Sequence, residues 1–181
     1  MAAPTTPWSW SQVASSPPPC PTPVPGSGTC LSSLPALPEG RQGAAAGLLS
    51  SGVLYCGGAG GDTRATADCW LLAPGAPAWR EVAPLLQAAA YAGSAVLEDR
   101  FYVAGGWTDQ RPNALDTLQV FADTIWRFGP KLLTARYGGC AVAHPGGYLL
   151  LLGGWGGAGG LAPQDMQRSA EVVDQRGPGG G

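Results

Sequence analysis

The stretch Phe101-Tyr102-Val103-Ala104-Gly105-Gly106 is an apolar run that ends in two glycines, and the same arrangement occurs twice more in the chain. Val53–Cys56 precedes the pair Gly57-Gly58, and Tyr148–Leu152 precedes the pair Gly153-Gly154. The first glycines of successive pairs are 48 residues apart in both intervals. A fixed period of this length indicates repeated supersecondary units, so we expect an array of similar units.

Other residues recur at nearly the same interval. A Trp-Arg pair occurs as Trp79-Arg80 and Trp126-Arg127. A run of small residues after a tyrosine occurs as Tyr91–Val96 and Tyr137–Val142. An acidic residue before an apolar run occurs as Asp68 and Asp116. In the third copy Ala170–Asp174 takes the place of the acidic and apolar run. Each complete unit therefore contains four short strand-like runs. Four strands in about 48 residues match the size of one β-propeller blade.

The residue types suit the strands of such a blade. Ala92–Ala95 consists of small residues, which fit an inner strand where blades converge. A glycine pair at a strand end permits backbone angles that a β-carbon forbids. Trp79 and Trp126 each offer a large apolar surface that can fill the gap between neighbouring sheets.

Together these features resemble the kelch repeat. The resemblance rests on the apolar run with its glycine pair, the acidic and apolar third strand, the tryptophan of the fourth strand, and a link that runs from a proline to an arginine. That link reads Pro35–Arg41 before the first unit and Pro130–Arg136 before the third. Ser169–Asp174 is similar to the third strand of the kelch-like subfamily.

The resemblance covers residues 30–174 and implies an all-β fold, a partial kelch β-propeller of about three four-stranded blades. The chain departs from the pattern at Ala90, where an arginine is expected, and at Cys30, where a tryptophan is expected. Leu85–Ala90 is the best helical candidate but is too short to stand alone, so we interpret it as a link between blades.

The two ends differ from the repeats. Residues 1–29 are rich in Pro and Ser, and we expect a disordered leader there. An alternative for Trp10–Ala14, which echoes Trp79–Ala83, is a fourth strand of the third blade. Residues 175–181 form a Gly-rich tail. Because propellers typically have four to eight blades, we expect a fragment, or a chain that self-associates through its open blade edges.

Charge and hydropathy exclude two classes of partner. The formal net charge is −2, and the ten Lys and Arg residues are dispersed, so no basic patch is available to attract phosphates. The longest apolar run, Tyr148–Leu152, is far shorter than the roughly 20 residues of a membrane-spanning helix. We therefore expect no nucleic-acid partner and no membrane partner.

The cysteines are odd in number and show no CxxC spacing; they are Cys20, Cys30, Cys56, Cys69 and Cys140. We expect Cys56 and Cys140 to be small buried residues within strands. A reducing compartment is then the better expectation, together with the absence of a signal peptide. The predicted location is the cytoplasm.

Catalytic and metal sites have little support. His144 is the only histidine, and we expect it to be exposed in the turn His144–Gly147. Zinc needs three or four converging Cys or His ligands, and kelch-type copper oxidases hold their metal with two tyrosines and two histidines. Gly156–Gly160 lacks the Lys-Ser/Thr of a phosphate loop. We expect no catalytic residue, no metal and no cofactor.

The remaining class of function is recognition of another protein, through loops carried on a rigid scaffold. The resemblance implies that kelch-like proteins contact their partners at two positions in each blade. One position follows the arginine at the start of the blade, and the other follows the glycine pair. In this chain these positions give Gln42, Tyr91 and Tyr137, with Arg136 beside the last, and Ala59, Trp107 and Trp155. Residues 108–113, Asp62 and Arg64 add polar groups nearby. The alternative is that Tyr91 and Trp107 simply pack between blades.

We therefore expect a protein–protein interaction module. The kelch-like resemblance further implies a substrate receptor of a cullin-based ubiquitin ligase, although no BTB domain is present in these residues. An actin-binding or generic scaffold protein is the alternative, followed by a fragment of a kelch-type enzyme.

Overall fold

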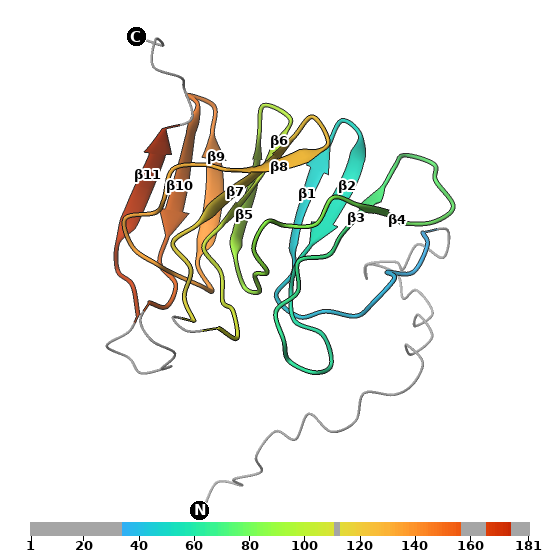
Figure 1. Ribbon diagram of the computed structural model, residues 1–181. Helices are drawn as coiled ribbons and strands as arrows, with labels where there is room; N and C mark the ends of the chain where they lie inside the picture. Colours follow the sequence, from blue (N-terminus) through green and yellow to red (C-terminus); the bar gives the residue numbers. More distant parts are fainter. Residues whose placement is uncertain (1–33, 111–112, 157–165, 175–181) are drawn as a thin grey trace, which may run out of the picture. The chain divides into compact units, whose positions relative to one another are not determined.

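The computed structural model describes residues 34–110, 113–156 and 166–174. Within these ranges the chain forms eleven β-strands in three antiparallel sheets and no helix (Figure 1). The predicted all-β, propeller-like fold is therefore confirmed. The leader (residues 1–29), the strand considered for Trp10–Ala14 and the tail (residues 175–181) lie outside the described residues.

The strands of each sheet are hydrogen-bonded in chain order, and we call each sheet a blade. Blade one contains β1 (Ala45–Leu49), β2 (Gly52–Cys56), β3 (Cys69–Leu72) and β4 (Arg80–Val82). Blade two contains β5 (Gly93–Leu97), β6 (Arg100–Ala104), β7 (Leu118–Ala122) and β8 (Ile125–Phe128). Blade three contains β9 (Cys140–His144), β10 (Tyr148–Leu152) and β11 (Ala170–Asp174). The inner strands β1, β5 and β9 lie next to one another (Figure 1).

In blades one and two the glycine pair joins the blade to the link that follows it. Gly57 has a φ of 65°, and a side chain there would collide with the carbonyl oxygen of Ala89. The amide of Gly58 donates a 2.9 Å hydrogen bond to that same carbonyl. The pair Gly105-Gly106 makes the same two contacts with the carbonyl of Arg136. The repeated glycines therefore allow a backbone approach that no other residue permits.

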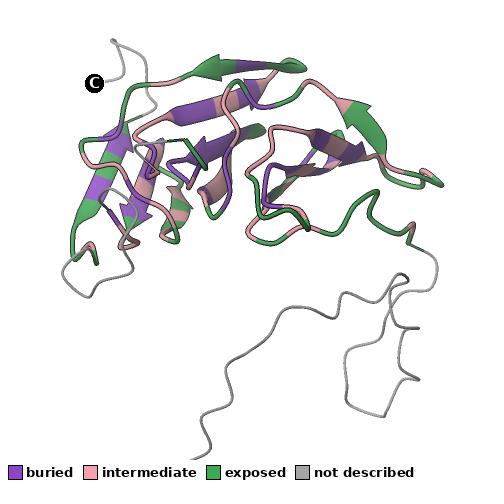
Figure 2. Cartoon of the chain, turned by 60° about the horizontal axis from the view of Figure 1, so that its bottom comes forward, coloured by how far each residue is buried: buried purple, intermediate pink, exposed green. Residues whose placement is uncertain are grey.

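Two apolar clusters hold the three blades together. One cluster combines Leu54 and Leu71 of blade one with Phe101 and Val103 of blade two, and the second lies between blades two and three. Because side chains alternate along a strand, the central blade buries both of its faces. Four of the five residues of β6 are buried, whereas β11 alternates between buried and exposed residues (Figure 2).

Trp126 fills the space between two blades, as predicted. Its side chain is buried against the rings of Phe101 and Phe121, and its indole Nε1–H donates to the carbonyl of Ala83 at 2.9 Å. Trp79 is the equivalent residue of blade one, because Arg80 and Arg127 occupy matching register positions. It is half-buried against the ring of Tyr55.

Buried polar side chains fix the links. Gln119 is fully buried, accepts a hydrogen bond from the amide of Gln87 and donates one to its carbonyl, each 2.9 Å long. At the matching position of blade three, Glu171 accepts a 2.6 Å hydrogen bond from the amide of Leu133. The segment Leu85–Ala90 is therefore a link, as predicted.

The alignment of blade two with its neighbours differs by one residue from the sequence-based alignment. The amide of Tyr91 donates to the carbonyl of Gly43, and the amide of Gly138 donates to the carbonyl of Tyr91, both at 2.7 Å. Tyr91 is thus equivalent to Gly43 and Gly138. The sequence-based alignment matched Tyr91 with Tyr137 by residue type, whereas the longer turn of blade three, with three residues between β9 and β10 against two between β5 and β6, places Gly138 in line with Tyr91.

Two other assignments also differ by one residue from the sequence-based alignment. The residue that corresponds to Arg41 and Arg136 is Ala89, not Ala90, because the carbonyls of Ala89 and Arg136 accept equivalent hydrogen bonds. Thr117, rather than Asp116, corresponds to Asp68, since their carbonyls accept from the first glycine of the pair.

The expectation for the cysteines was correct for Cys56, which is buried within β2, but wrong for Cys140. Cys56 and Cys69 are directly opposite on β2 and β3 and form a disulfide, with both residues fully buried. Cys140 is a free and exposed thiol rather than a buried residue. Disulfides persist in oxidising compartments, so the cysteines no longer support the cytoplasmic prediction. Within the described ranges there is no helix with the length and apolar character needed to cross a bilayer.

Candidate functional site

The predicted partner-binding positions are arranged by a repeated pair of isolated β-bridges at the start of each blade. Gln42 bridges to Ala59 in blade one, and Tyr137 bridges to Trp155 in blade three. In blade two the bridge joins Trp107 to Ala90, the residue directly before Tyr91. These bridges tie the start of each blade to the segment after its glycine pair, and so bring the two predicted positions together.

A groove with a volume of about 540 Å³ lies across these bridges. It is lined by Gln42, Ala59, Thr63, Tyr91, Trp107, Tyr137, Gly138 and Trp155. Four aromatic side chains from blades two and three therefore meet in one concave surface. None of the described lining residues carries a formal charge at neutral pH, so recognition by these residues depends on apolar contact and on hydrogen bonds to Tyr, Trp, Thr and Gln.

Tyr91 holds an unusual backbone conformation in this groove. Its φ is 54°, in the left-handed region, where Gly43 and Gly138 at the equivalent positions have φ of 64° and 66°. For a residue with a β-carbon this conformation is strained, by roughly 1–2 kcal/mol. The ring packs closely over Gly43 and remains 38% exposed. Tyr91 thus presents an aromatic side chain where the other two blades have none.

Each of the two tryptophans is held by a pair of backbone hydrogen bonds to the residue that it bridges. Trp107 exchanges hydrogen bonds of 2.9 and 2.6 Å with Ala90, and Trp155 exchanges bonds of 2.9 and 2.7 Å with Tyr137. A β-carbon on Gly138 would lie 3.3 Å from the Trp155 ring, so this ring packs on the backbone of blade three. Both tryptophans are half-buried, which leaves part of each ring at the surface of the groove.

Arg136 lies away from the groove. Its side chain is 4% exposed and donates to the carbonyl of Gly153 at 2.8 Å and to the hydroxyl of Ser169 at 3.1 Å. It also pairs with the buried carboxylate of Glu171 at 3.5 Å. Its guanidinium therefore holds blade three together, a role that the sequence pattern did not indicate.

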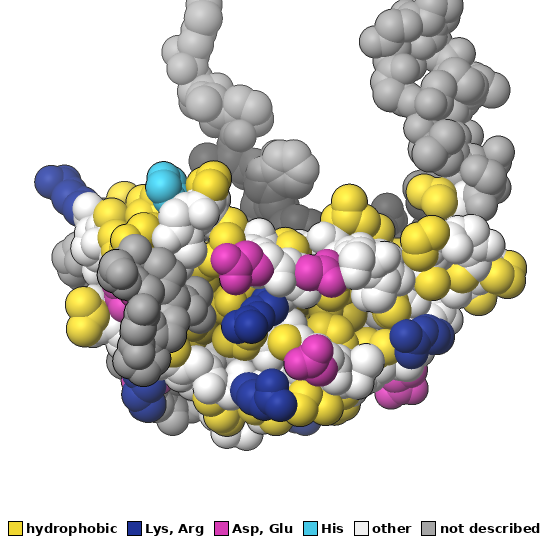
Figure 3. Space-filling view, turned by 90° about the horizontal axis from the view of Figure 1, so that it is seen from above, with side chains coloured by type: hydrophobic (Ala, Val, Ile, Leu, Met, Phe, Trp, Pro, Cys, Tyr) yellow, Lys and Arg dark blue, Asp and Glu magenta, His cyan; other side chains and the backbone are white. Residues whose placement is uncertain are grey.

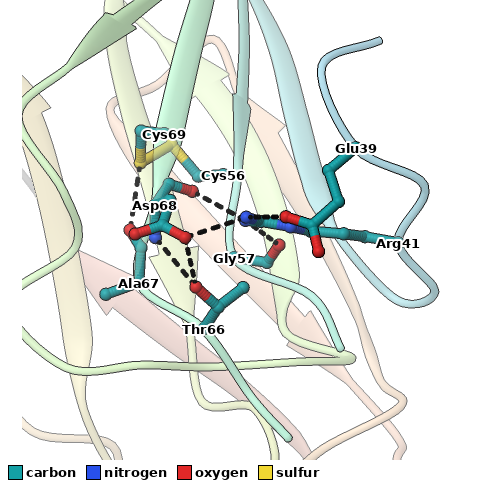
Figure 4. Close-up of polar contacts among 8 residues, drawn as sticks. All are labelled: Glu39, Arg41, Cys56, Gly57, Thr66, Ala67, Asp68 and Cys69. Atoms are coloured by element: carbon teal, nitrogen blue, oxygen red, sulfur yellow. Dashed lines mark hydrogen bonds and ion pairs between the residues drawn. A yellow bond between two sulfur atoms is a disulfide. The ribbon is translucent and has the colours of Figure 1, made fainter. Parts of the chain in front are cut away.

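Arg41 makes the corresponding cluster in blade one (Figure 4). Its guanidinium donates to the carbonyls of Gly57 and Asp68 at 3.2 Å each and pairs with the carboxylates of Asp68 and Glu39 at 2.8 Å. A hydrogen bond from the Thr66 hydroxyl, and then the nearby Arg41 charge, lower the pKa of Asp68 below its usual value. We call Arg41, Glu39, Gly57, Thr66 and Asp68 the Arg41 cluster.

The flanking polar loops are divided between two surfaces. Thr63 lines the groove, whereas Asp62 and Arg64 line a second cavity beside the Arg41 cluster. In blade two the amide of Thr108 donates to the carbonyl of Asn113, and Thr108 is buried. Two members of the predicted polar loop, residues 111 and 112, lie outside the described residues.

Outside the groove, the described residues show no metal-binding cluster. The described residues contain no group of three or more His, Cys, Asp or Glu side chains that could hold a metal ion. His144 is exposed at the end of β9, and its Nδ1 accepts a hydrogen bond from the amide of Gly146. On the face shown in Figure 3, positive and negative side chains are interspersed among apolar ones.

Comparisons with known proteins support the fold alone. No family model matches the chain, and no curated protein matches it. The chain is similar to the solved structure of YjhT, with a TM-score of 0.64 and 15% sequence identity. The match covers 79% of this chain and 45% of that structure, so this chain corresponds to less than half of YjhT.

Proposed function

We propose that this chain is a kelch-type propeller module that binds a partner protein through the groove described above. The observation that carries the proposal is the convergence of four aromatic rings in one uncharged groove of about 540 Å³. Tyr and Trp provide large rigid contact areas and are enriched among residues that dominate binding energy. A groove of this kind suits a short peptide segment of the partner.

The lining residues define the chemistry of that segment. Tyr91, Trp107, Tyr137 and Trp155 offer ring faces and the hydrogen-bonding groups of their hydroxyls and indoles. The partner segment is therefore expected to be apolar, with proline or aliphatic side chains between the rings and backbone carbonyls facing the donors. Because the described lining residues are uncharged, we expect their contribution to binding to depend little on ionic strength.

Display of a random peptide library on the purified chain tests the proposal. Peptides enriched on the wild-type chain are measured for affinity against the variant Tyr91→Gly. Glycine suits this position because Gly43 and Gly138 adopt the same conformation at the equivalent positions. The variant removes the ring without disturbing the backbone, so we expect at least a tenfold loss of affinity, or about 1.4 kcal/mol.

Phe128→Ala is the matched control, since this exposed aromatic residue lies on β8 and outside the groove. We expect enriched peptides to bind the control with unchanged affinity and to bind Trp155→Ala weakly. If the enriched peptides bind Tyr91→Gly and Trp155→Ala as well as they bind the wild-type chain, the groove is not the binding site.

The role in a ubiquitin ligase is a separate part of this proposal. Presentation of a captured partner to a cullin-based ligase requires a domain that binds the ligase, in addition to the groove. Capture through the groove is the part that the described residues support, and it is common to an adaptor and to a scaffold.

A further inference from the structure

We propose that two copies of this chain assemble head to tail into a closed six-bladed ring, a surface and a partner that the proposed function does not include. The argument depends on the two outward faces of the array. The face of blade one that points away from blade two is here called the initial face. The face of blade three that points away from blade two is called the terminal face.

The terminal face carries the same kind of apolar residues as the face of blade two that packs against blade three. Leu150, Leu152 and Val172 occupy the register positions of Tyr102, Ala104 and Val120 in blade two. Tyr102 and Ala104 are buried in the cluster between blades two and three. On the terminal face Leu152 is 42% and Val172 is 59% exposed.

The initial face provides the opposite half of such an interface. Val53, Tyr55 and Leu72 occupy the register positions of Phe101, Val103 and Phe121, which blade two buries against blade one. Trp79 corresponds likewise to Trp126, and Leu48 on the same face is 72% exposed. One end of the array therefore carries the first half of an inter-blade interface, and the other end carries the second half.

The backbone groups at the two ends are complementary in the same way. Each existing joint contains two hydrogen bonds, such as Gly106 N–H to the Arg136 carbonyl and Gly138 N–H to the Tyr91 carbonyl. Continuing this series beyond blade three pairs Gly154 N–H with the Arg41 carbonyl and Gly43 N–H with the Gly138 carbonyl of a second copy. In the described part of the chain, neither amide has a hydrogen-bond partner.

Gly153 supports the same assembly. A β-carbon on Gly57 or Gly105 would collide with the carbonyl of the next link, whereas at Gly153 the nearest atom would lie 3.7 Å away. The close approach that accounts for the first two glycines is therefore not made at the third within the described chain. A link from a second copy would make it.

The chain length relative to a related fold favours two copies. This chain covers 45% of the YjhT structure, so two copies correspond to about nine-tenths of its length. Two three-bladed arrays give six blades, within the usual range of four to eight. A head-to-tail interface closes into a ring when the rotation between copies is right, and otherwise extends into open filaments.

Light scattering during size-exclusion chromatography tests the assembly directly. We expect a species of twice the chain mass of 18.3 kDa. Leu48→Asp on the initial face and Val142→Asp on the terminal face should each halve that mass. Leu133→Asp is the control, because this residue is 90% exposed and lies on neither face. A wild-type monomer at all concentrations, or an open series of larger species, would overturn the proposal.

A designed crosslink tests the geometry of the joint. Cys140 corresponds to Gly93, where a β-carbon would lie 3.3 Å from that of Ala141, and Ala141 corresponds to Ala46. Under mild oxidation Ala46→Cys should therefore form a disulfide with Cys140 of a second copy, which suits the usual Cβ–Cβ separation of roughly 3.5–4.5 Å. Crosslinking that persists after Cys140→Ser, or that does not occur, contradicts the head-to-tail joint.

Discussion

Blades one and two have the same strand order but stabilise the start of the blade by different means. In blade one the Arg41 guanidinium binds two backbone carbonyls and two carboxylates. In blade two Ala89 occupies the arginine position, and it is buried with Leu85 and Leu115. An apolar contact thus replaces a cluster of charged hydrogen bonds at one position of the repeat.

The replacement of the arginine by alanine leaves a buried hydroxyl of blade two without a hydrogen-bond partner among the described residues. Asp68 of blade one and Ser169 of blade three each bind the arginine of their own blade through their side chains. Thr117 is the equivalent residue of blade two, and its buried hydroxyl has no hydrogen-bond partner among the described residues. The comparison shows that the fold requires side chains that fill the space at this position. A hydrogen-bonded arginine and an apolar contact are two ways to fill it.

Among the variants that test this comparison, Arg136→Met should lower the free energy of unfolding most. Arg136→Met leaves the carboxylate of Glu171 buried without its partner, and removing one member of a buried ion pair costs about 3–5 kcal/mol. The free energy of unfolding in urea measures the loss. The double variant Arg136→Met/Glu171→Gln should recover part of it. Equal instability of the single and double variants would contradict a cost that arises from the unpaired carboxylate.

Reduction of the disulfide should have the next largest effect, because only blade one among the described sheets has such a bond. Cys56 and Cys69 are 13 residues apart, and closing a loop of that size contributes about 3 kcal/mol. Unfolding with and without a reductant measures the difference. Replacing the pair by Ala and Leu, the residues at these positions in blade two, should abolish the response to reductant.

Acid should weaken blade one more than blade two through Asp68. Its pKa is lowered in the folded chain, so its stabilising contribution is fully present above the ordinary value of 3.8 and is lost as the pH falls through the lower folded value. Thr66→Val should weaken this dependence most, because the Thr66 hydroxyl bond is the main cause of the lowered pKa, and Arg41→Met should weaken it further and lower stability by about 1–2 kcal/mol. Unfolding measured from about pH 2 to 6 checks both effects. An unchanged acid limb in Asp68→Asn would disprove the assignment to this carboxylate.

The smallest effect is expected at Thr117. Thr117→Val removes a buried hydroxyl that lacks a partner, so stability should remain within about 1 kcal/mol of the wild-type value or rise. Ser169→Ala in blade three is the informative comparison, because that hydroxyl accepts a hydrogen bond from Arg136 and its loss should destabilise. A large loss at Thr117 would mean that its hydroxyl has an unrecognised partner.

The repeat was readable from the sequence because glycine has a distinct physical role at each strand end. Apolar runs and glycine pairs predicted the positions of β2, β6 and β10, and the link Leu85–Ala90 followed from its place in the repeat. The same alignment predicted six residues that now line the groove, including Tyr91, Trp107 and Trp155. These positions came from the two sites per blade that the kelch-like resemblance implies, and the period of the repeat placed them in this sequence.

Three features depend on information that spacing does not contain. Tyr91 was aligned with Tyr137 by residue type, although its backbone matches Gly138. Arg136 was predicted to contact a partner because it precedes Tyr137, but adjacent residues of an extended chain point in opposite directions. The disulfide became visible only from strand register, which places Cys56 opposite Cys69.

That disulfide has a consequence for the groove. Ala59 and Thr63, which line it, lie on the segment between Cys56 and Cys69, and the Arg41 cluster also binds both ends of this segment. The wall contributed by blade one is therefore preorganised before any partner arrives, and less conformational entropy is lost when one binds. Reduction would loosen this wall and weaken binding mainly by faster dissociation, although no residue that contacts the partner has changed.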